Sequence, residues 1–105
     1  MLLYFDAGVS LALGMGIWAV VLDDDGELIL LDREVRGKTK VHELEKLASE
    51  KAAEYAGALG VETIRGDCLT SIMRAKKTRP RYDWEWVPSK ENLADGFTKD
   101  YHAAS

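Results

Sequence analysis

Four acidic residues occupy positions where the sequence pattern predicts buried surfaces or the edge of a sheet: Asp6, Glu45, Asp67 and Asp95. Two of them follow apolar, strand-like runs, one lies on an amphipathic helix, and one lies near the start of a final helix. Carboxylates that meet at one edge of an α/β sheet repel one another unless a cation neutralises them. Oxygen ligands without a cluster of His or Cys favour magnesium or manganese over zinc. The pattern therefore predicts a site for divalent metal ions.

Each acid also has a purely structural explanation when it is taken alone. Asp67 precedes a predicted helix, where Asp is a favoured N-cap residue. Asp95 could be a surface acid in the first turn of a helix, and Glu45 could be a solvated helix residue. Asp6 is the hardest to explain in this way, because a carboxylate at the end of a buried strand needs a partner. The order and context of the four acids carry the metal-site prediction.

The first part of the chain predicts three strands. Residues 2–6 form a short apolar run that ends in a carboxylate, and residues 16–22 are rich in branched and aromatic side chains. Residues 27–35 return after the turn Asp23-Asp24-Asp25-Gly26, in which Asp-Gly supplies the positive φ angles of a tight turn. We therefore expect a hairpin between the second and third strands.

The middle of the chain alternates helices with strands. Apolar residues recur at i, i+3 and i+4 over residues 41–59, which predicts an amphipathic helix. Residues 61–65 predict a fourth strand. A short second helix begins near Leu69 and stops before Pro80, since the residue before a proline disfavours helix.

The last part of the chain predicts a fifth strand and a final helix. Residues 82–87 alternate aromatic and charged side chains, and Ser89 or Asn92 caps a helix that runs toward Tyr101. The element order is βββαβαβα. It predicts one α/β domain over residues 1–105, with a mixed five-stranded sheet and helices on both faces.

Composition limits the class of protein. Hydrophobic residues make up 47% and charged residues 30%, which is typical of a folded domain and excludes a disordered tail. No apolar run approaches the roughly 20 residues of a membrane span. Cys68 is the only cysteine, so an internal disulfide is excluded and a reducing compartment, the cytoplasm, is expected. The chain has no Gln and one Asn, and this depletion favours a thermophilic source.

Positive charge is concentrated in the last third of the chain. The net charge is −4, yet residues 1–73 carry 7 basic and 13 acidic side chains, a balance of −6, whereas residues 74–105 carry 7 and 5, a balance of +2. Two interpretations stay open: a solvated helix end, or a patch that contacts phosphates. The basic run comprises Arg74, Lys76, Lys77, Arg79 and Arg81.

This arrangement of elements and acids resembles ribonuclease H. The segment over residues 87–99 looks especially like the ribonuclease H segment of copia-type retrotransposon polyproteins. The resemblance covers nearly the whole chain. The matching motifs are Leu3-Tyr4-Phe5-Asp6, Glu45-Lys46-Leu47-Ala48, Ile64-Arg65-Gly66-Asp67, Trp84-Glu85-Trp86-Val87 and Val87-Pro88-Ser89-Lys90-Glu91-Asn92-Leu93-Ala94-Asp95-Gly96-Phe97-Thr98-Lys99.

The resemblance implies an endonuclease that hydrolyses the RNA strand of an RNA/DNA hybrid with two Mg²⁺ or Mn²⁺ ions. Its metal-binding and catalytic carboxylates would be Asp6, Glu45, Asp67 and Asp95. Glu43 is the rival of Glu45, which we prefer for its alanine-lined helix face and its Glu-x-x-Ala pattern. Duplex shape and 2′-hydroxyl contacts would select the hybrid. The nucleic-acid-binding residues would be Arg74, Lys76, Lys77, Arg79, Arg81 and Lys90.

The sequence departs from many members of that family in two places. Only residues 68–81 separate the second catalytic Asp from the last strand, so there is no room for a basic protrusion. Where many members have a loop histidine, this chain has Pro88-Ser89-Lys90, and its histidines, His42 and His102, lie elsewhere. Two alternatives therefore stay open: another nuclease on the same fold, such as a junction resolvase, and a non-catalytic module that binds nucleic acid or a partner subunit.

Overall fold

The computed structural model describes residues 1–10, 13–37 and 39–98. No helix within these ranges is long and apolar enough to cross a membrane. A last helical turn spans residues 95–98. The other elements are β1 (Leu2–Ser10), β2 (Met15–Asp24), β3 (Glu27–Gly37), α1 (Val41–Leu59), β4 (Thr63–Gly66), α2 (Leu69–Thr78), β5 (Asp83–Trp86) and a 3-10 turn, η1 (Ser89–Glu91).

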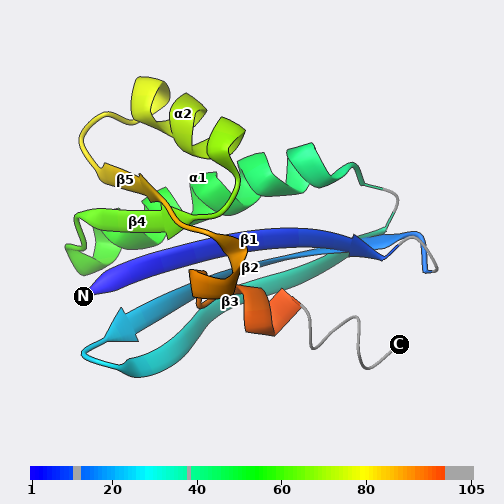
Figure 1. Cartoon of the computed structure of the whole chain (residues 1–105), viewed down its shortest axis with the longest axis horizontal. Coiled ribbons are helices and arrows are strands. Elements are labelled where there is room, and N and C mark those ends of the chain that lie inside the picture. The colour runs from blue at the N-terminus through cyan, green and yellow to red at the C-terminus, as the bar shows by residue number, and fades with distance from the viewer. Residues whose placement is uncertain (11–12, 38, 99–105) are drawn as a thin grey trace.

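The five strands form one mixed sheet in the order β3-β2-β1-β4-β5 (Figure 1). β1 pairs antiparallel with β2 and parallel with β4. On either side of these strands, β2 pairs antiparallel with β3, and β4 pairs parallel with β5. The β2–β3 hairpin turns at Asp25 and Gly26, whose φ angles are 51° and 91°. The predicted Asp-Gly turn is therefore confirmed, as is the mixed sheet.

Successive residues of β1 point to opposite faces of the sheet and join two separate clusters. Leu3 and Phe5 belong to the larger cluster, which includes residues of α1 and α2, whereas Tyr4 packs with Val21 and Ala94. Figure 1 shows α1 and α2 on one side of the sheet and the orange C-terminal segment (92–98) on the other. The prediction of helices on both faces is confirmed, with only short helical turns on the second face.

α1 lies close to the sheet because its buried face is built from small side chains. Ala48, Ala52 and Ala56 are at most 1% exposed. The helix ends at Gly60, whose φ of 71° is left-handed and whose N–H donates to the carbonyl of Ala56. The predicted helix bounds, 41–59, are confirmed.

All five strands differ from the prediction at one end or both, and the differences in β1 and β4 have a clear physical cause. β1 continues past Asp6 to Ser10, because its pairing with β2 persists over that length. β4 begins at Thr63 rather than at residue 61, because the N–H of Val61 still donates to Ala56 at the end of α1. Val61 therefore completes the C-terminal cap of α1 instead of starting the strand.

The second helix agrees with the prediction, whereas the last one differs. α2 begins at Leu69 and ends at Thr78, before Pro80. The expected last helix is divided: η1 comes first, and helical geometry resumes only over residues 95–98. The part of it that was expected to reach Tyr101 lies outside the described residues.

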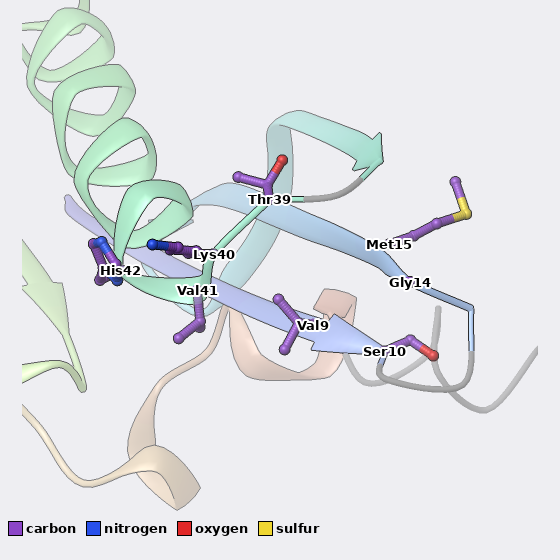
Figure 2. Close-up of a pocket in the computed structure, with 8 residues that line it drawn as sticks. All are labelled: Val9, Ser10, Gly14, Met15, Thr39, Lys40, Val41 and His42. Carbon is purple, nitrogen blue, oxygen red and sulfur yellow. The ribbon is translucent and has the colours of Figure 1, made fainter.

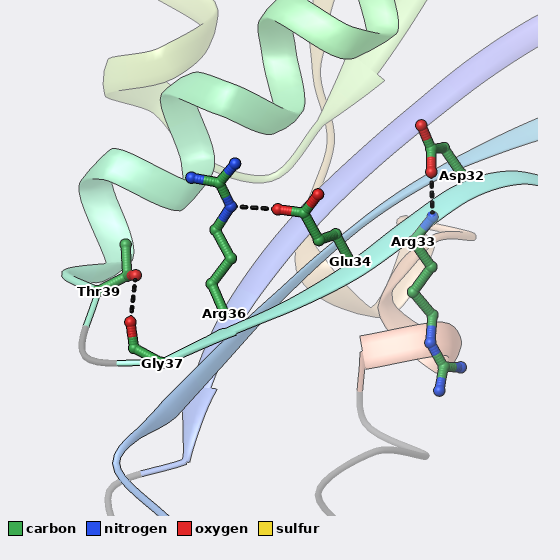
Figure 3. Close-up of polar contacts among 6 residues, drawn as sticks. All are labelled: Asp32, Arg33, Glu34, Arg36, Gly37 and Thr39. Atoms are coloured by element: carbon green, nitrogen blue, oxygen red, sulfur yellow. Dashed lines mark hydrogen bonds and ion pairs between the residues drawn. The ribbon is translucent and has the colours of Figure 1, made fainter.

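β3 forms one edge of the sheet, and charged side chains line its second half (Figure 3). Glu34 and Arg36 form an ion pair, and Asp32 Oδ1 accepts the N–H of Arg33 at 2.9 Å. The guanidinium of Arg33 extends toward the C-terminal segment, where Nη1 donates to the carbonyl of Phe97 at 3.4 Å. β3 thereby contacts the segment that carries Asp95.

Candidate functional site

Asp6 lies inside β1, where this strand loses its neighbour on one side. The parallel pairing of β1 with β4 ends at Tyr4 and Arg65, whereas the antiparallel pairing with β2 continues to Ser10. The sequence-based placement of Asp6 at the end of a strand is therefore wrong. Asp6 instead follows the end of the β1–β4 ladder, and its side chain is only 4% exposed.

Asp67 directly follows β4, at the carboxyl end of the parallel strands. The preceding Gly66 permits a close approach, because a Cβ there would lie 2.6 Å from the ring of Phe5. The indole Nε1 of Trp86 donates to the carbonyl of Asp67 at 2.9 Å and ties it to β5. Asp67 is not the N-cap of α2, since Cys68 holds that position. The capping explanation for Asp67 is therefore wrong.

Glu45 lies one turn into α1, on the face that packs against the sheet. It is 7% exposed, and Ala48 and Ala52 lie on the same buried face. A hydrogen bond from the backbone of Ala7 connects its carboxyl group to β1. Glu43, the rival residue, is exposed to solvent.

The structure brings three of the four predicted acids together. Asp6, Glu45 and Asp67 each offer one carboxylate oxygen, and these three atoms lie within 4.8 Å of one another. Asp95 is not in this group, but its carboxyl group is near enough to that of Asp6 to help raise the pKa of Asp6. It approaches from the opposite end of the chain, in the C-terminal segment.

The pKa values of two of these acids are strongly raised. The pKa of Asp6 rises from 3.8 to about 7, mainly through burial and then through the negative charge of Asp67. The pKa of Glu45 rises from 4.5 to about 8, through burial and the charges of Asp6 and Asp67. The cause in both cases is crowded negative charge away from water. A divalent cation would supply the missing countercharge, so these side chains fit a metal ion.

Two uncharged residues of the C-terminal segment contact the acids, and the sequence analysis did not single them out as site residues. Asn92 was considered only as a helix cap; its Nδ2 donates to Asp67 Oδ2 at 3.2 Å. Thr98 Oγ1 donates to Asp6 Oδ2 at 2.8 Å. Both belong to the copia-like segment, and that resemblance was the one signal that could have found them.

Solved structures identify the fold, although no protein-family model and no curated protein match the sequence significantly. RNase H1 from the halophilic archaeon Halobacterium salinarum NRC-1 matches with a TM-score of 0.73 and 19% identity. The match covers 99% of this chain and 98% of that one. The chain has the ribonuclease H fold.

Two further structures support the same conclusion. LC11-RNase H1, solved in complex with an RNA/DNA hybrid, matches with a TM-score of 0.66 and 20% identity over 99% of both chains. The N-terminal RNase H domain of Rv2228c from Mycobacterium tuberculosis, solved as a fusion with maltose-binding protein, has a TM-score of 0.66 and 16% identity. That match covers 98% of this chain and 94% of the other. The fold that the resemblance implied is confirmed.

The basic run lies at the end of α2 that is remote from Asp67 on this ribonuclease H fold. With a rise of about 1.5 Å per residue, Arg74 to Lys77 lie roughly 10–15 Å along the chain from Asp67. Four of the five basic side chains are exposed and Arg79 is half-buried. None of them forms an ion pair within the described ranges. Lys90, which is also exposed, lies on η1 between β5 and Asn92.

A pocket of about 510 Å³ opens between the β1–β2 connection and the start of α1 (Figure 2). Val9 and Ser10 line it from β1, and Lys40 and His42 line it from the helix start. None of the four acids lines this pocket. His42 is exposed there, and His102 lies outside the described residues.

Proposed function

We propose that this protein is a metal-dependent endonuclease that hydrolyses the RNA strand of RNA/DNA hybrids. The observation that carries the proposal is the convergence of Asp6, Glu45 and Asp67. One carboxylate oxygen of each lies within 4.8 Å of the others, beside the end of the β1–β4 ladder of a ribonuclease H fold. Asp95, whose charge helps raise the pKa of Asp6, is the fourth proposed catalytic carboxylate. Acids held this close repel one another unless a cation neutralises them, which favours a metal-dependent enzyme over a binding module that needs no metal.

We assign Asp6, Glu45, Asp67 and Asp95 as ligands of two Mg²⁺ or Mn²⁺ ions. The support is the raised pKa values of Asp6 and Glu45, which reflect burial and then the negative charges of the neighbouring acids. Bound ions would polarise the scissile phosphate, activate a water molecule and stabilise the leaving oxygen. The chain itself holds the carboxylates in place, and burial of Asp6 and Glu45 keeps bulk water from the ligand atoms.

The hybrid substrate is supported by the exposed basic side chains at the end of α2 and on η1. Arg74, Lys76, Lys77, Arg79 and Arg81 would contact phosphates of the duplex, and Lys90 would do so close to the acids. Phosphate contacts give affinity without base specificity, which suits an enzyme that recognises duplex shape and 2′-hydroxyl groups. The solved complex of LC11-RNase H1 with an RNA/DNA hybrid supports the same substrate class.

A cleavage assay tests this function directly. End-labelled RNA/DNA hybrid, single-stranded RNA, duplex RNA and a four-way DNA junction are each incubated with the protein and Mg²⁺ or Mn²⁺. We expect cleavage of the RNA strand of the hybrid alone. Cleavage of the junction instead would identify a resolvase, and binding without cleavage in either metal would identify a non-catalytic module.

Asp67→Asn is the control variant for this assay, because it keeps the shape of the side chain and removes the charge. We expect nearly complete loss of cleavage, since a lost metal ligand costs several kcal/mol of transition-state stabilisation. A cooperative unfolding transition with a Tm no lower than that of wild type would show that the fold survives. Activity within about tenfold of wild type would contradict the ligand assignment.

The cytoplasm and a thermophilic source remain our proposals for this chain's origin. Cys68 is its only cysteine and is half-buried, which suits a reducing compartment. Thermal unfolding tests the second proposal. We expect a Tm well above the range of about 45–65 °C that is usual for mesophilic domains.

A further inference from the structure

Asn92 lies beside the end of the β1–β4 ladder, where its side chain contacts both Phe5 and Asp67. Its side chain is buried, with 4% exposure, and makes three hydrogen bonds. Nδ2 donates to the carbonyl of Phe5 at 2.9 Å and to Asp67 Oδ2 at 3.2 Å, while Oδ1 accepts the N–H of Ala94 at 3.0 Å. Both hydrogens of the amide are therefore used, one on β1 and one on the carboxylate of Asp67.

Thr98 makes the corresponding contact to Asp6 from the same segment. Its side chain is 3% exposed, and Oγ1 lies 2.8 Å from Asp6 Oδ2 and 3.0 Å from the carbonyl of Asp95. The hydroxyl has one hydrogen, and the shorter contact is with the charged acceptor. A hydrogen bond to a carboxylate is stronger than one to a neutral carbonyl. Donation to Asp6 is therefore favoured.

The two donors, the amide of Asn92 and the hydroxyl of Thr98, are uncharged and therefore do not compete with a metal ion for the carboxylates. A Lys or Arg at these positions would neutralise the carboxylates and compete with a cation. An amide or a hydroxyl instead fixes the direction of one carboxylate oxygen and leaves the negative charge of the carboxylate available to the ion. Groups that orient ligands in this way typically change metal affinity when they are removed.

We infer that Asn92 and Thr98 are positioning residues, which hold the carboxylates of Asp67 and Asp6 in the orientation that binds metal. This inference rests on the proposed function, because it presumes that these carboxylates are ligands. Neither residue touches the reacting atoms; each acts through the acid it contacts. The C-terminal segment thereby aligns two acids, one within β1 and one directly after β4.

The segment is itself held by the second face of the sheet. Ala94 packs against Tyr4 and Val21, and the carbonyl of Phe97 accepts a hydrogen bond from Arg33 on β3. Contacts with β2 and β3, which carry no catalytic acid, therefore help to position Asn92 and Thr98, together with contacts to β1. The ligand geometry therefore depends on the face of the sheet that α1 and α2 do not cover.

Three threonine variants test the role of Thr98. Thr98→Val removes the donor and keeps the shape, Thr98→Ser keeps the donor, and Thr63→Val makes the same exchange on β4, away from the acids. Mn²⁺ affinity is measured by isothermal titration calorimetry. We expect Thr98→Val to weaken binding by about ten- to a hundredfold, with Thr98→Ser and Thr63→Val within about threefold of wild type. In hybrid cleavage, kcat of Thr98→Val should fall while KM stays unchanged, because a buried Thr98 does not reach the duplex.

The outcomes separate this inference from the proposed function. If wild type binds Mn²⁺ and cleaves the hybrid, and Thr98→Val matches it in both respects, the positioning role is wrong and the proposed function stands. If wild type binds no Mn²⁺, both are wrong. Thermal unfolding of each variant establishes that it is folded before its affinity is compared.

Asn92 allows a test in the unmodified protein. The chain has one Asn and no Gln, so the side-chain NH₂ pair in a ¹H–¹⁵N correlation spectrum belongs to Asn92. We expect two well-separated signals that exchange slowly with water and shift on titration with Mg²⁺, and we expect the Mg²⁺-dependent shift to disappear in Asp67→Ala. Signals at random-coil positions, or signals that saturating Mg²⁺ leaves unmoved, would overturn the role of Asn92.

Discussion

One carboxylate oxygen of Asp6 and one of Glu45 lie within 4.8 Å of each other, although the first residue lies on β1 and the second on α1. Both side chains are buried, and both pKa values are raised far above those of free carboxyl groups. Both carboxyl groups therefore retain protons near neutral pH, and a bound cation would displace these protons. Proton binding, metal binding and stability should be coupled at this pair.

The first prediction concerns the stability of the metal-free protein as a function of pH. The folded-state pKa values, about 7 for Asp6 and about 8 for Glu45, lie above the ordinary values of 3.8 and 4.5. Between these limits the folded state binds more protons than the unfolded state, so stability falls as the pH rises. We expect the Tm in EDTA to decrease from pH 5 to pH 8, and Mg²⁺ to raise it more at pH 8 than at pH 6, because metal binding displaces those protons.

Glu45→Gln provides the control for this prediction, since an amide does not titrate. The variant should show a smaller decrease of Tm with pH in EDTA. A Tm of the wild type that is constant or increases over this range would contradict the raised pKa values.

The second prediction distinguishes Glu45 from Glu43. Glu45 is buried beside Asp6, whereas Glu43 is exposed two residues earlier on α1. Glu45→Gln should lower kcat for hybrid cleavage by more than a hundredfold, or about 3 kcal/mol, and Glu43→Gln should change it by less than about threefold. Single-turnover cleavage rates measure both. The reverse ranking would move the ligand by two residues along the helix.

The sequence predicted elements best where the pattern is long and local. The repeated apolar spacing of α1 predicted its bounds, and Asp25-Gly26 predicted the hairpin, since helix period and turn chemistry are properties of neighbouring residues. The extent of β1 was not predictable in this way. The strand continues past Asp6 only because β2 pairs with it as far as Ser10.

The same distinction applies to the site. The acids could be selected because a carboxylate beside apolar residues conflicts with burial, which is visible in sequence. The contacts of Asn92 with Phe5 and of Thr98 with Asp6 join residues 87 and 92 positions apart, respectively. No local pattern encodes such pairs, because they form only after the C-terminal segment packs on the sheet.

The third prediction concerns Gly66, which brings Asp67 close to β1. A Cβ at this position would lie 2.6 Å from the ring of Phe5, so either the ring or β4 must shift. Gly66→Ala should lower the free energy of unfolding by about 1–3 kcal/mol, as is usual for overpacking of a core. It should also weaken Mn²⁺ binding, since the displacement is passed to Asp67.

Gly37→Ala is the matched control, because a Cβ there meets no atom within 4 Å. Denaturant unfolding and calorimetry on the two variants measure both effects. Equal stability of the two variants would show that the approach of β4 to Phe5 is not a constraint on the site.

The last prediction concerns the basic run on α2. Lys76 and Lys77 are exposed and form no ion pair among the described residues, so they are available for phosphates. Each phosphate contact contributes about 0.9 to the slope of log K against log salt for duplex DNA, so replacing both lysines by alanine should reduce the slope for the hybrid by about 2. Arg36 and Lys51, replaced together, change the net charge equally but lie on β3 and α1, where each pairs with a glutamate. Binding of a fluorescent hybrid, measured with Ca²⁺ in place of Mg²⁺ over a series of salt concentrations, should separate the two double variants. An unchanged slope for the Lys76 and Lys77 variant would mean that this end of α2 is only a solvated helix terminus.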